Sequence, residues 1–142
     1  MYQKDYILKM IEMMGQFIAA ILSKISKKDY KEAEELLEES YETLLKDSAA
    51  KFTFIPKEKL TEQLISEFNF VNGHLEILAQ LFKAEGELRF AQGNNKLSLE
   101  FLEKAFVLFE FLDKNTKTYS MDRISDMSLI TDKISILKKV VL

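Results

Sequence analysis

His74, the one histidine of this 142-residue chain, is the first residue to weigh for acid–base chemistry. Catalysis by an imidazole needs a companion such as a serine on a strand-to-helix turn, and a metal needs further ligands at helical spacing. The sequence around His74 supplies neither, and a site with two imidazoles is excluded by count. His74 directly follows Asn72-Gly73 at an expected helix start, so we interpret it as a polar surface or capping residue.

Other reactive combinations are equally incomplete. The chain has no cysteine, which excludes disulfides, thiolate metal sites and thiol nucleophiles. Gly86 and Gly93 are not followed by the Lys-Ser or Lys-Thr pair of a phosphate-binding loop. An acidic cluster could hold a divalent cation, but its spacing favours a solvated helix face; it consists of Glu34, Glu35, Glu38, Glu39 and Glu42.

We therefore predict no catalytic residue, no cofactor, no metal and no enzymatic activity. A carboxylate-based enzyme or metal site near His74 stays open as a less favoured alternative.

The net charge and the hydropathy pattern limit the classes of partner that we expect the protein to bind. The net charge is −3, so electrostatic attraction to nucleic acid or to an anionic membrane is not expected. Lys133, Lys138 and Lys139 are interspersed with acids, as in an ordinary helix terminus. The longest uninterrupted apolar run, residues 17–22, is too short to cross a bilayer, and no export signal is recognisable. We expect a cytoplasmic protein with no nucleic-acid or membrane partner.

The elements that position these residues are predicted to be helices. Four glycines and one proline leave few breaks, and apolar residues recur with a period near 3.6 nearly everywhere. The pattern predicts one all-α domain over residues 1–142. It contains about six helices in antiparallel hairpins, over residues 4–26, 29–46, 57–71, 74–92, 96–114 and 121–141.

Residues 47–56 break this pattern. Phe52, Phe54 and Ile55 are too apolar for a free loop, so we expect this irregular segment to lie over the core. Pro56 suits the first turn of the helix over 57–71. Asn72-Gly73 predicts a left-handed end to that helix, and Ser120 or Asp122 is expected to cap the last one.

Small residues recur at a fixed spacing in the second half of the chain. Gly86 in mid-helix, Gly93 in the turn, and Ser98 and Ala105 in the next helix allow two helices to approach closely. In this pattern residues 81–109 resemble the tetratricopeptide-repeat family, and residues 14–45 do so more faintly. Residues 2–12 resemble the start of a bacterial tetratricopeptide-like family of unknown function.

The resemblance implies a right-handed superhelix or bundle. Its repeat-like units would span residues 4–46 and 74–114, and residues 121–141 would form a capping helix. In that family the first helix of each hairpin lines a concave partner-binding surface, which here would carry Gln80, Lys83, Glu87 and Phe90. Lys83 matches a lysine that binds peptide carboxylates in some members, but Glu87 would repel such a carboxylate.

Two apolar faces exceed what such hairpins need, and we expect them to mediate self-association. They comprise Met10, Met13 and Phe17 near the N-terminus, and Val107 and Phe111 in the second half. The sequence thus predicts a non-enzymatic protein- or peptide-binding module that can form a homodimer. The alternative is a helical sensor domain with an interior cavity, lined by phenylalanines, for a small apolar ligand.

Overall fold

The computed structural model describes residues 2–116 and 120–141, with side chains from Lys4 onward. Within these residues all regular structure is helical and no strand occurs, which confirms the all-α class. This described part of the chain has seven α-helices and one 3₁₀ turn, rather than six helices. They are α1 (Tyr2–Ser26), α2 (Tyr30–Leu45), α3 (Ala50–Thr53), η1 (Lys57–Lys59), α4 (Leu60–Ser66), α5 (Asn72–Ala91), α6 (Asn95–Asn115) and α7 (Met121–Val140).

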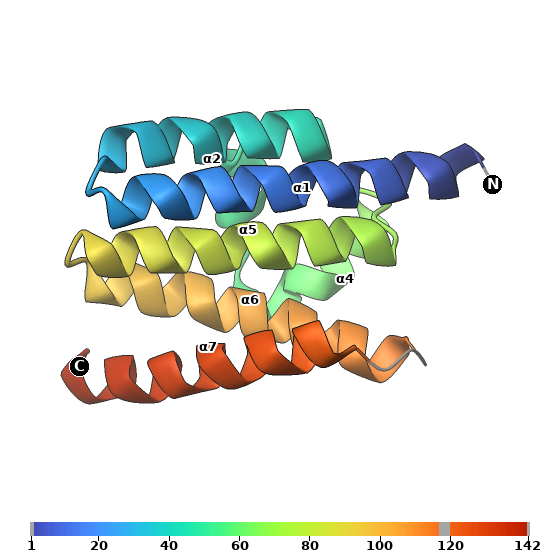
Figure 1. The fold of residues 1–142 in the computed structure, drawn as a ribbon. Coiled ribbons are helices and arrows are strands. Elements are labelled where there is room, and N and C mark those ends of the chain that lie inside the picture. The colour runs from blue at the N-terminus through green and yellow to red at the C-terminus, as the bar shows by residue number, and fades with distance from the viewer. Residues whose placement is uncertain (1, 117–119, 142) are drawn as a thin grey trace.

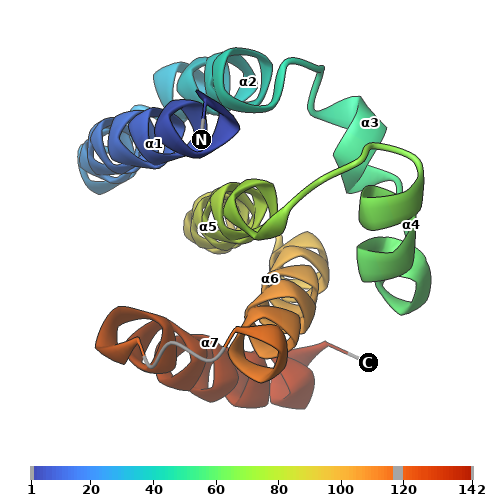
Figure 2. The same ribbon diagram turned by 90° about the vertical axis from the view of Figure 1, so that its right-hand side faces the viewer.

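The long helices form two antiparallel hairpins and one added helix. Helices α1 and α2 form the first hairpin, α5 and α6 the second, and α7 packs on α6 (Figure 1). Helices α1, α5 and α7 all run in the same direction (Figure 1). Viewed along the helices, α5 lies between the first hairpin and the α6–α7 pair, with α3 and α4 at one side (Figure 2). Because α5 is enclosed in this way, apolar side chains are buried around most of its circumference.

The contact between α5 and α6 depends on small residues, as the sequence predicted. Ser98 Oγ donates a buried hydrogen bond to the Gly86 carbonyl oxygen at 2.7 Å. A Cβ atom on Gly86 would lie 2.6 Å from Cγ and Cδ2 of Leu102. Gly93 adopts a φ of 84° in the turn between the two helices, a conformation that favours glycine. The two backbones therefore meet where a larger side chain would not fit.

The segment before α5 differs from the sequence prediction. The expected helix over 57–71 is a 3₁₀ turn followed by the short α4, and α5 already begins at Asn72. The left-handed residue is Asn69, with a φ of 56°, rather than Asn72 or Gly73. This early exit from the helix lets Phe68 and Phe70 pack against Phe52, with ring centroids 5.2 and 5.6 Å apart.

The segment over 47–56 covers the core through part of its apolar side chains. Phe52 and Ile55 are buried as expected, but Phe54 is 84% exposed, so that part of the prediction is wrong. Lys104 on α6 fixes this segment, because its Nζ donates a 2.6 Å hydrogen bond to the Thr53 carbonyl oxygen at the end of α3. Burial lowers the pKa of Lys104.

A polar cluster interrupts the core between α2 and α5. Glu85 is buried and pairs with Arg89 at 3.2 Å, and Arg89 also approaches Glu34 on α2 at 3.8 Å. The fully buried Tyr41 hydroxyl lies beside Glu85 without reaching hydrogen-bond geometry with any described group. Burial raises the pKa of Glu85, and the Arg89 charge opposes that rise only in part.

Helix α1 is long and apolar. Between Lys4 and Ser26 it meets the length and composition of a membrane-crossing helix, and 17% of its most apolar window is buried in the fold. Core helices of soluble proteins and N-terminal signal sequences meet the same criteria, so this finding assigns no location.

The close approach at Gly86 predicts opposite effects of one substitution at two helical glycines. Gly15→Ala on α1 should stabilise the fold by about 0.5–1 kcal/mol, since no described atom lies within 4 Å of the added methyl. Gly86→Ala adds the same helix propensity but forces Leu102 to move, so it should be less stable than Gly15→Ala by about 1–3 kcal/mol. Urea unfolding of both variants measures this difference, and equal stabilities would contradict the packing described.

The buried Glu85 carboxyl predicts a pH-dependent stability difference. The pKa of a carboxyl in the unfolded chain is near 4.5, and below that pH a carboxyl with a raised folded-state pKa does not lower the free energy of unfolding. As the pH rises from there through the folded-state pKa, the free energy of unfolding falls, because the buried carboxyl must become charged. Glu85→Gln should therefore match the wild type near pH 4 and become relatively more stable toward pH 7. Thermal unfolding across this range tests the prediction. Glu39→Gln, at an exposed position on α2, controls for the loss of one charge, and a Glu85→Gln difference that is constant with pH would contradict it.

Candidate interaction groove

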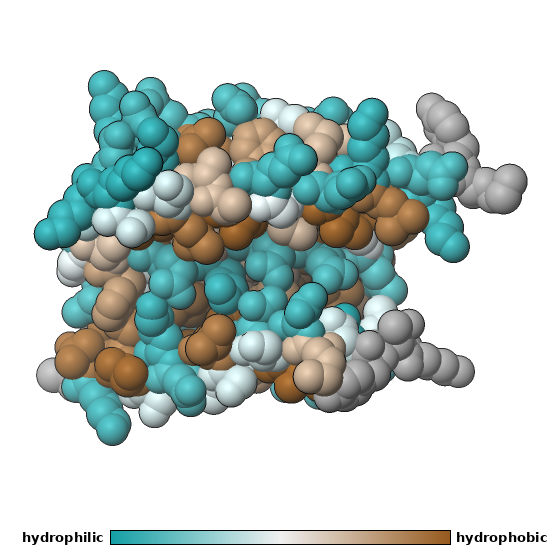
Figure 3. All heavy atoms as spheres, in the orientation of Figure 1, coloured by the Kyte–Doolittle hydropathy of each residue, from teal (hydrophilic) through white to brown (hydrophobic). Residues whose placement is uncertain are grey.

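A groove runs between α1 and α7, with α5 as its floor. One part of it has a volume of about 320 Å³ and is lined by residues of all three helices: Met14, Gly15, Ile18, Gln80, Asp122, Ser125 and Asp126. The space-filling view shows a hydrophilic band over α5 between hydrophobic areas on α1 and α7 (Figure 3). We call this surface the interaction groove.

The two walls of the interaction groove carry exposed apolar side chains. On α1, Leu8 and Leu22 lie seven residues before and after Gly15 and so share its face.

The same reasoning applies to α7, where Asp126 and Lys133 both contact α5. Leu129 lies between these two residues on that side of the helix, and Ile136 and Val140 continue it. Their side chains are 59%, 59% and 60% exposed. Apolar side chains this exposed along one face are typical of an interface.

The four residues predicted for a partner-binding face all lie on the α5 floor, but three of them also hold α7. Gln80 Nε2 donates to Asp126 Oδ2 at 2.8 Å, and Glu87 Oε2 accepts from Lys133 Nζ at 2.9 Å. The same Lys133 ammonium lies 4.5 Å from the centre of the Phe90 ring, within cation–π range.

Lys83, the fourth of these residues, is half-buried and forms no ion pair among the described residues.

The residues predicted for self-association do not form one surface. Met10 is buried in the core, and Met13 and Phe17 are half-buried against it. Val107 and Phe111 are half-buried on α6, away from the interaction groove.

The exposed wall residues Leu129, Ile136 and Val140 were missed at the sequence level. The strongest apolar periodicity of α7 is that of its buried face, which includes Ile130 and Leu137. The exposed apolar residues lie directly beside that face, so the sequence pattern does not separate the two.

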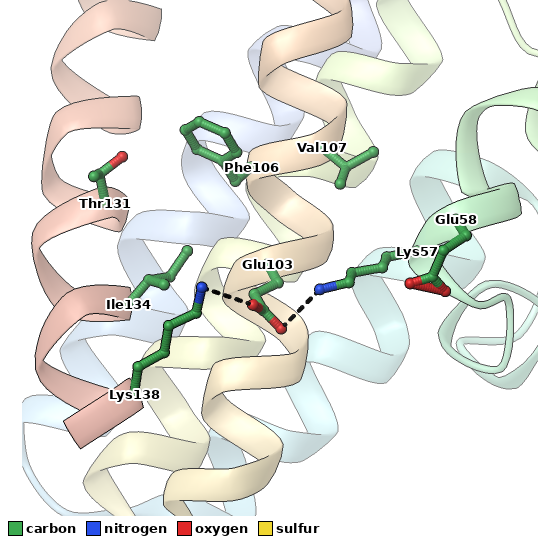
Figure 4. A pocket seen from close by; sticks show the side chains of 8 residues that line it. All are labelled: Lys57, Glu58, Glu103, Phe106, Val107, Thr131, Ile134 and Lys138. Atoms are coloured by element: carbon green, nitrogen blue, oxygen red, sulfur yellow. Dashed lines mark ion pairs between the residues drawn. The ribbon is translucent and has the colours of Figure 1, made fainter. Parts of the chain in front are cut away.

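A second depression, the α6–α7 cleft, lies on the other side of α7 between η1, α6 and α7. It encloses about 380 Å³, and its lining is Lys57, Glu58, Glu103, Phe106, Val107, Thr131, Ile134 and Lys138. Figure 4 shows the Glu103 carboxylate between the ammonium groups of Lys57 and Lys138, at 3.3 and 3.8 Å. This cleft is where the structure places Val107.

His74 occupies a structural position at the start of α5. Its Nδ1 accepts a 3.1 Å hydrogen bond from the backbone N–H of Val71, the residue that precedes the helix. The imidazole stacks on Phe70 with ring centroids 4.8 Å apart, and burial lowers the pKa of His74. These contacts fit the capping interpretation. Within residues 2–116 and 120–141, no three acidic or histidine side chains group as metal ligands.

Comparison of the chain with protein-family models, with curated proteins and with solved structures finds no match in any of the three. The tetratricopeptide resemblance therefore stays a prediction from the residues that carry it. The interaction groove is interpreted from its own geometry.

Proposed function

We propose that this protein is a non-enzymatic interaction module that binds protein through the interaction groove. The observation that carries the proposal is the distribution of exposed apolar side chains. Of the twelve large apolar side chains exposed among the described residues, eight lie on α1 and α7, and five of these belong to the groove walls described above: Leu8, Leu22, Leu129, Ile136 and Val140. Such surface costs free energy in water, about 25 cal/mol for each Å² that a partner could cover, so its concentration on the two helices that form the walls of one groove favours a protein partner.

The arrangement of the helices supports the same proposal. Helices α1, α5 and α7 lie side by side in one direction, as the first helices of successive repeats would in a tetratricopeptide-like superhelix (Figure 1). The predicted face of Gln80, Lys83, Glu87 and Phe90 then forms the floor of a concave surface. Its polar floor and apolar walls suit an amphipathic segment whose apolar side chains contact both walls.

A second copy of the chain is the partner we expect first. The walls of the groove carry solvent-exposed apolar side chains, Leu129, Ile136 and Val140 on α7 and Leu22 on α1. Burying the same faces of two copies would form a symmetric interface. Homodimerisation, a cytoplasmic location and the absence of a nucleic-acid or membrane partner all belong to this proposal.

The sensor-domain alternative receives less support. Phe52, Phe82 and Phe109 are fully buried and packed in the core rather than arranged around an interior space. The depressions described above open onto solvent, so neither is the enclosed interior cavity that the sensor-domain alternative requires. The histidine-centred enzyme is disfavoured by the capping contacts of His74.

Charged substitutions on the groove wall should abolish association. We expect the wild type to dimerise at micromolar concentrations, and the double variant Leu129→Lys/Ile136→Lys to weaken the dimer by more than about tenfold, because two buried apolar contacts become solvated ammonium groups. Sedimentation equilibrium measures the effect, with circular dichroism as the check on folding. The double variant Ser128→Lys/Ser135→Lys makes the same charge change at exposed positions of the same helix and should dimerise like the wild type.

Affinity capture from the native lysate with these three proteins extends the test to other partners. A protein retained by the wild type and the serine variant, but lost from the leucine–isoleucine variant, is the expected result. A wild-type monomer at all concentrations that also captures nothing contradicts the proposal. Flotation with phospholipid vesicles should leave the protein in the soluble fraction, and flotation of the wild type would assign the exposed α1 and α7 faces to a membrane.

A further inference from the structure

We infer that the α6–α7 cleft binds a small amphipathic monocarboxylate, an apolar chain or ring that carries one carboxylate. This site lies apart from the interaction groove and does not depend on the proposed function. Its evidence is an apolar depression that ends in two lysine ammonium groups sharing one carboxylate.

The apolar part of the ligand would lie against α6 and α7. Phe106 and Val107 on α6 and Ile134 on α7 supply the wall and floor of a space of about 380 Å³. Small-molecule sites commonly enclose about 300–1,000 Å³ and are lined mostly by apolar side chains. The half-buried Val107 projects from α6 beside charged residues such as Glu103 (Figure 4). A ligand with an apolar part would account for an apolar side chain at this position.

The polar end of the cleft favours an anionic head group. Lys57 on η1 and Lys138 on α7 reach Glu103 from opposite sides of α6 (Figure 4). Their side chains are 42% and 62% exposed, whereas that of Glu103 is 21% exposed. Each ammonium group has three N–H donors. Because the two lysines share the single carboxylate of Glu103, they have N–H donors left that can bind the carboxylate of a ligand.

The remaining charges do not reverse this preference. Glu58 also lines the cleft, but it forms no ion pair with either lysine among the described residues. With Glu58 included, two lysines and two glutamates line the cleft, so the preference for an anionic head group rests on the position of the two ammonium groups and not on a net positive charge. A cationic head group would compete with Lys57 and Lys138 for Glu103, and a neutral one would gain no ion pair. A carboxylate is therefore the head group that the cleft accommodates best.

The test compares three ligands with one decyl chain and different head groups. Titration of the ¹⁵N-labelled protein is followed by NMR, with decanoate and decyltrimethylammonium kept below their micelle concentrations and decanol below its solubility limit. Decanoate should shift the amide signals of residues around Val107 and Ile134, with an affinity about tenfold above that of the other two ligands. Equal affinities for the three, or shifts confined to the interaction groove, would overturn the inference.

Two variants test the head-group contacts directly. Lys57→Gln/Lys138→Gln should weaken decanoate binding by about tenfold, whereas Lys59→Gln/Lys139→Gln, the same charge change at exposed neighbouring positions, should leave it unchanged. Glu103→Gln removes the internal competitor for both ammonium groups and should strengthen decanoate binding several-fold. Weaker decanoate binding to a folded Glu103→Gln protein, or unchanged binding to the Lys57/Lys138 variant, would contradict the assignment.

Discussion

The close approach of α5 and α6 at Gly86 is the constraint on which the rest of the structure depends. With no side chain at Gly86, Leu102 fills the space beside the α5 backbone and Ser98 hydrogen-bonds to it. This contact places α6 and α7 on one side of α5, while the first hairpin covers the other (Figure 2). A single polar strip of α5 is left uncovered, and that strip is the floor of the interaction groove. A packing requirement in the core thus determines where the candidate binding surface lies.

The sequence predicted best those features of the fold that depend on residues close together in the chain. The glycine and serine spacing predicted the α5–α6 hairpin, and Ser120 caps α7 as expected, its hydroxyl accepting from the Arg123 N–H. The prediction over 57–71 was wrong because the helix ends early where Phe70 packs against Phe52, a contact between two separate segments that local residue spacing does not reveal. The floor residues of the groove could be predicted from one helix alone. The walls of the groove could not be predicted in this way. Which apolar side chains of α7 face solvent depends on how that helix packs on α6, and the sequence of α7 alone does not give its orientation.

Helix α7 contributes to both depressions and is itself lightly buried. Its Asp126 and Lys133 reach the groove floor, while Thr131, Ile134 and Lys138 line the α6–α7 cleft. Among its described residues Arg123, Ile130 and Leu137 are the buried ones, and its main packing partner is α6. The apolar contact that holds α7 on α6 is therefore small, and the hydrogen bond of Asp126 and the ion pair of Lys133 with α5 add to it. Ionic strength, which weakens partly exposed pairs such as Lys133–Glu87, acts on the same helix that shapes both surfaces.

The common direction of α1, α5 and α7 also gives the interaction groove an electrical polarity along its length. The N-terminal ends of the three helices, near Asp5 and Asp122, lie at one end of the groove and carry the positive ends of their peptide dipoles, and the C-terminal ends, near Lys24 and Lys139, lie at the other end. The flanking acids and bases are those that such an alignment attracts. A helical segment bound lengthwise between the walls would carry its own dipole, and opposed dipoles attract. For the segment that we propose, this polarity favours the orientation in which its chain runs against α1, α5 and α7.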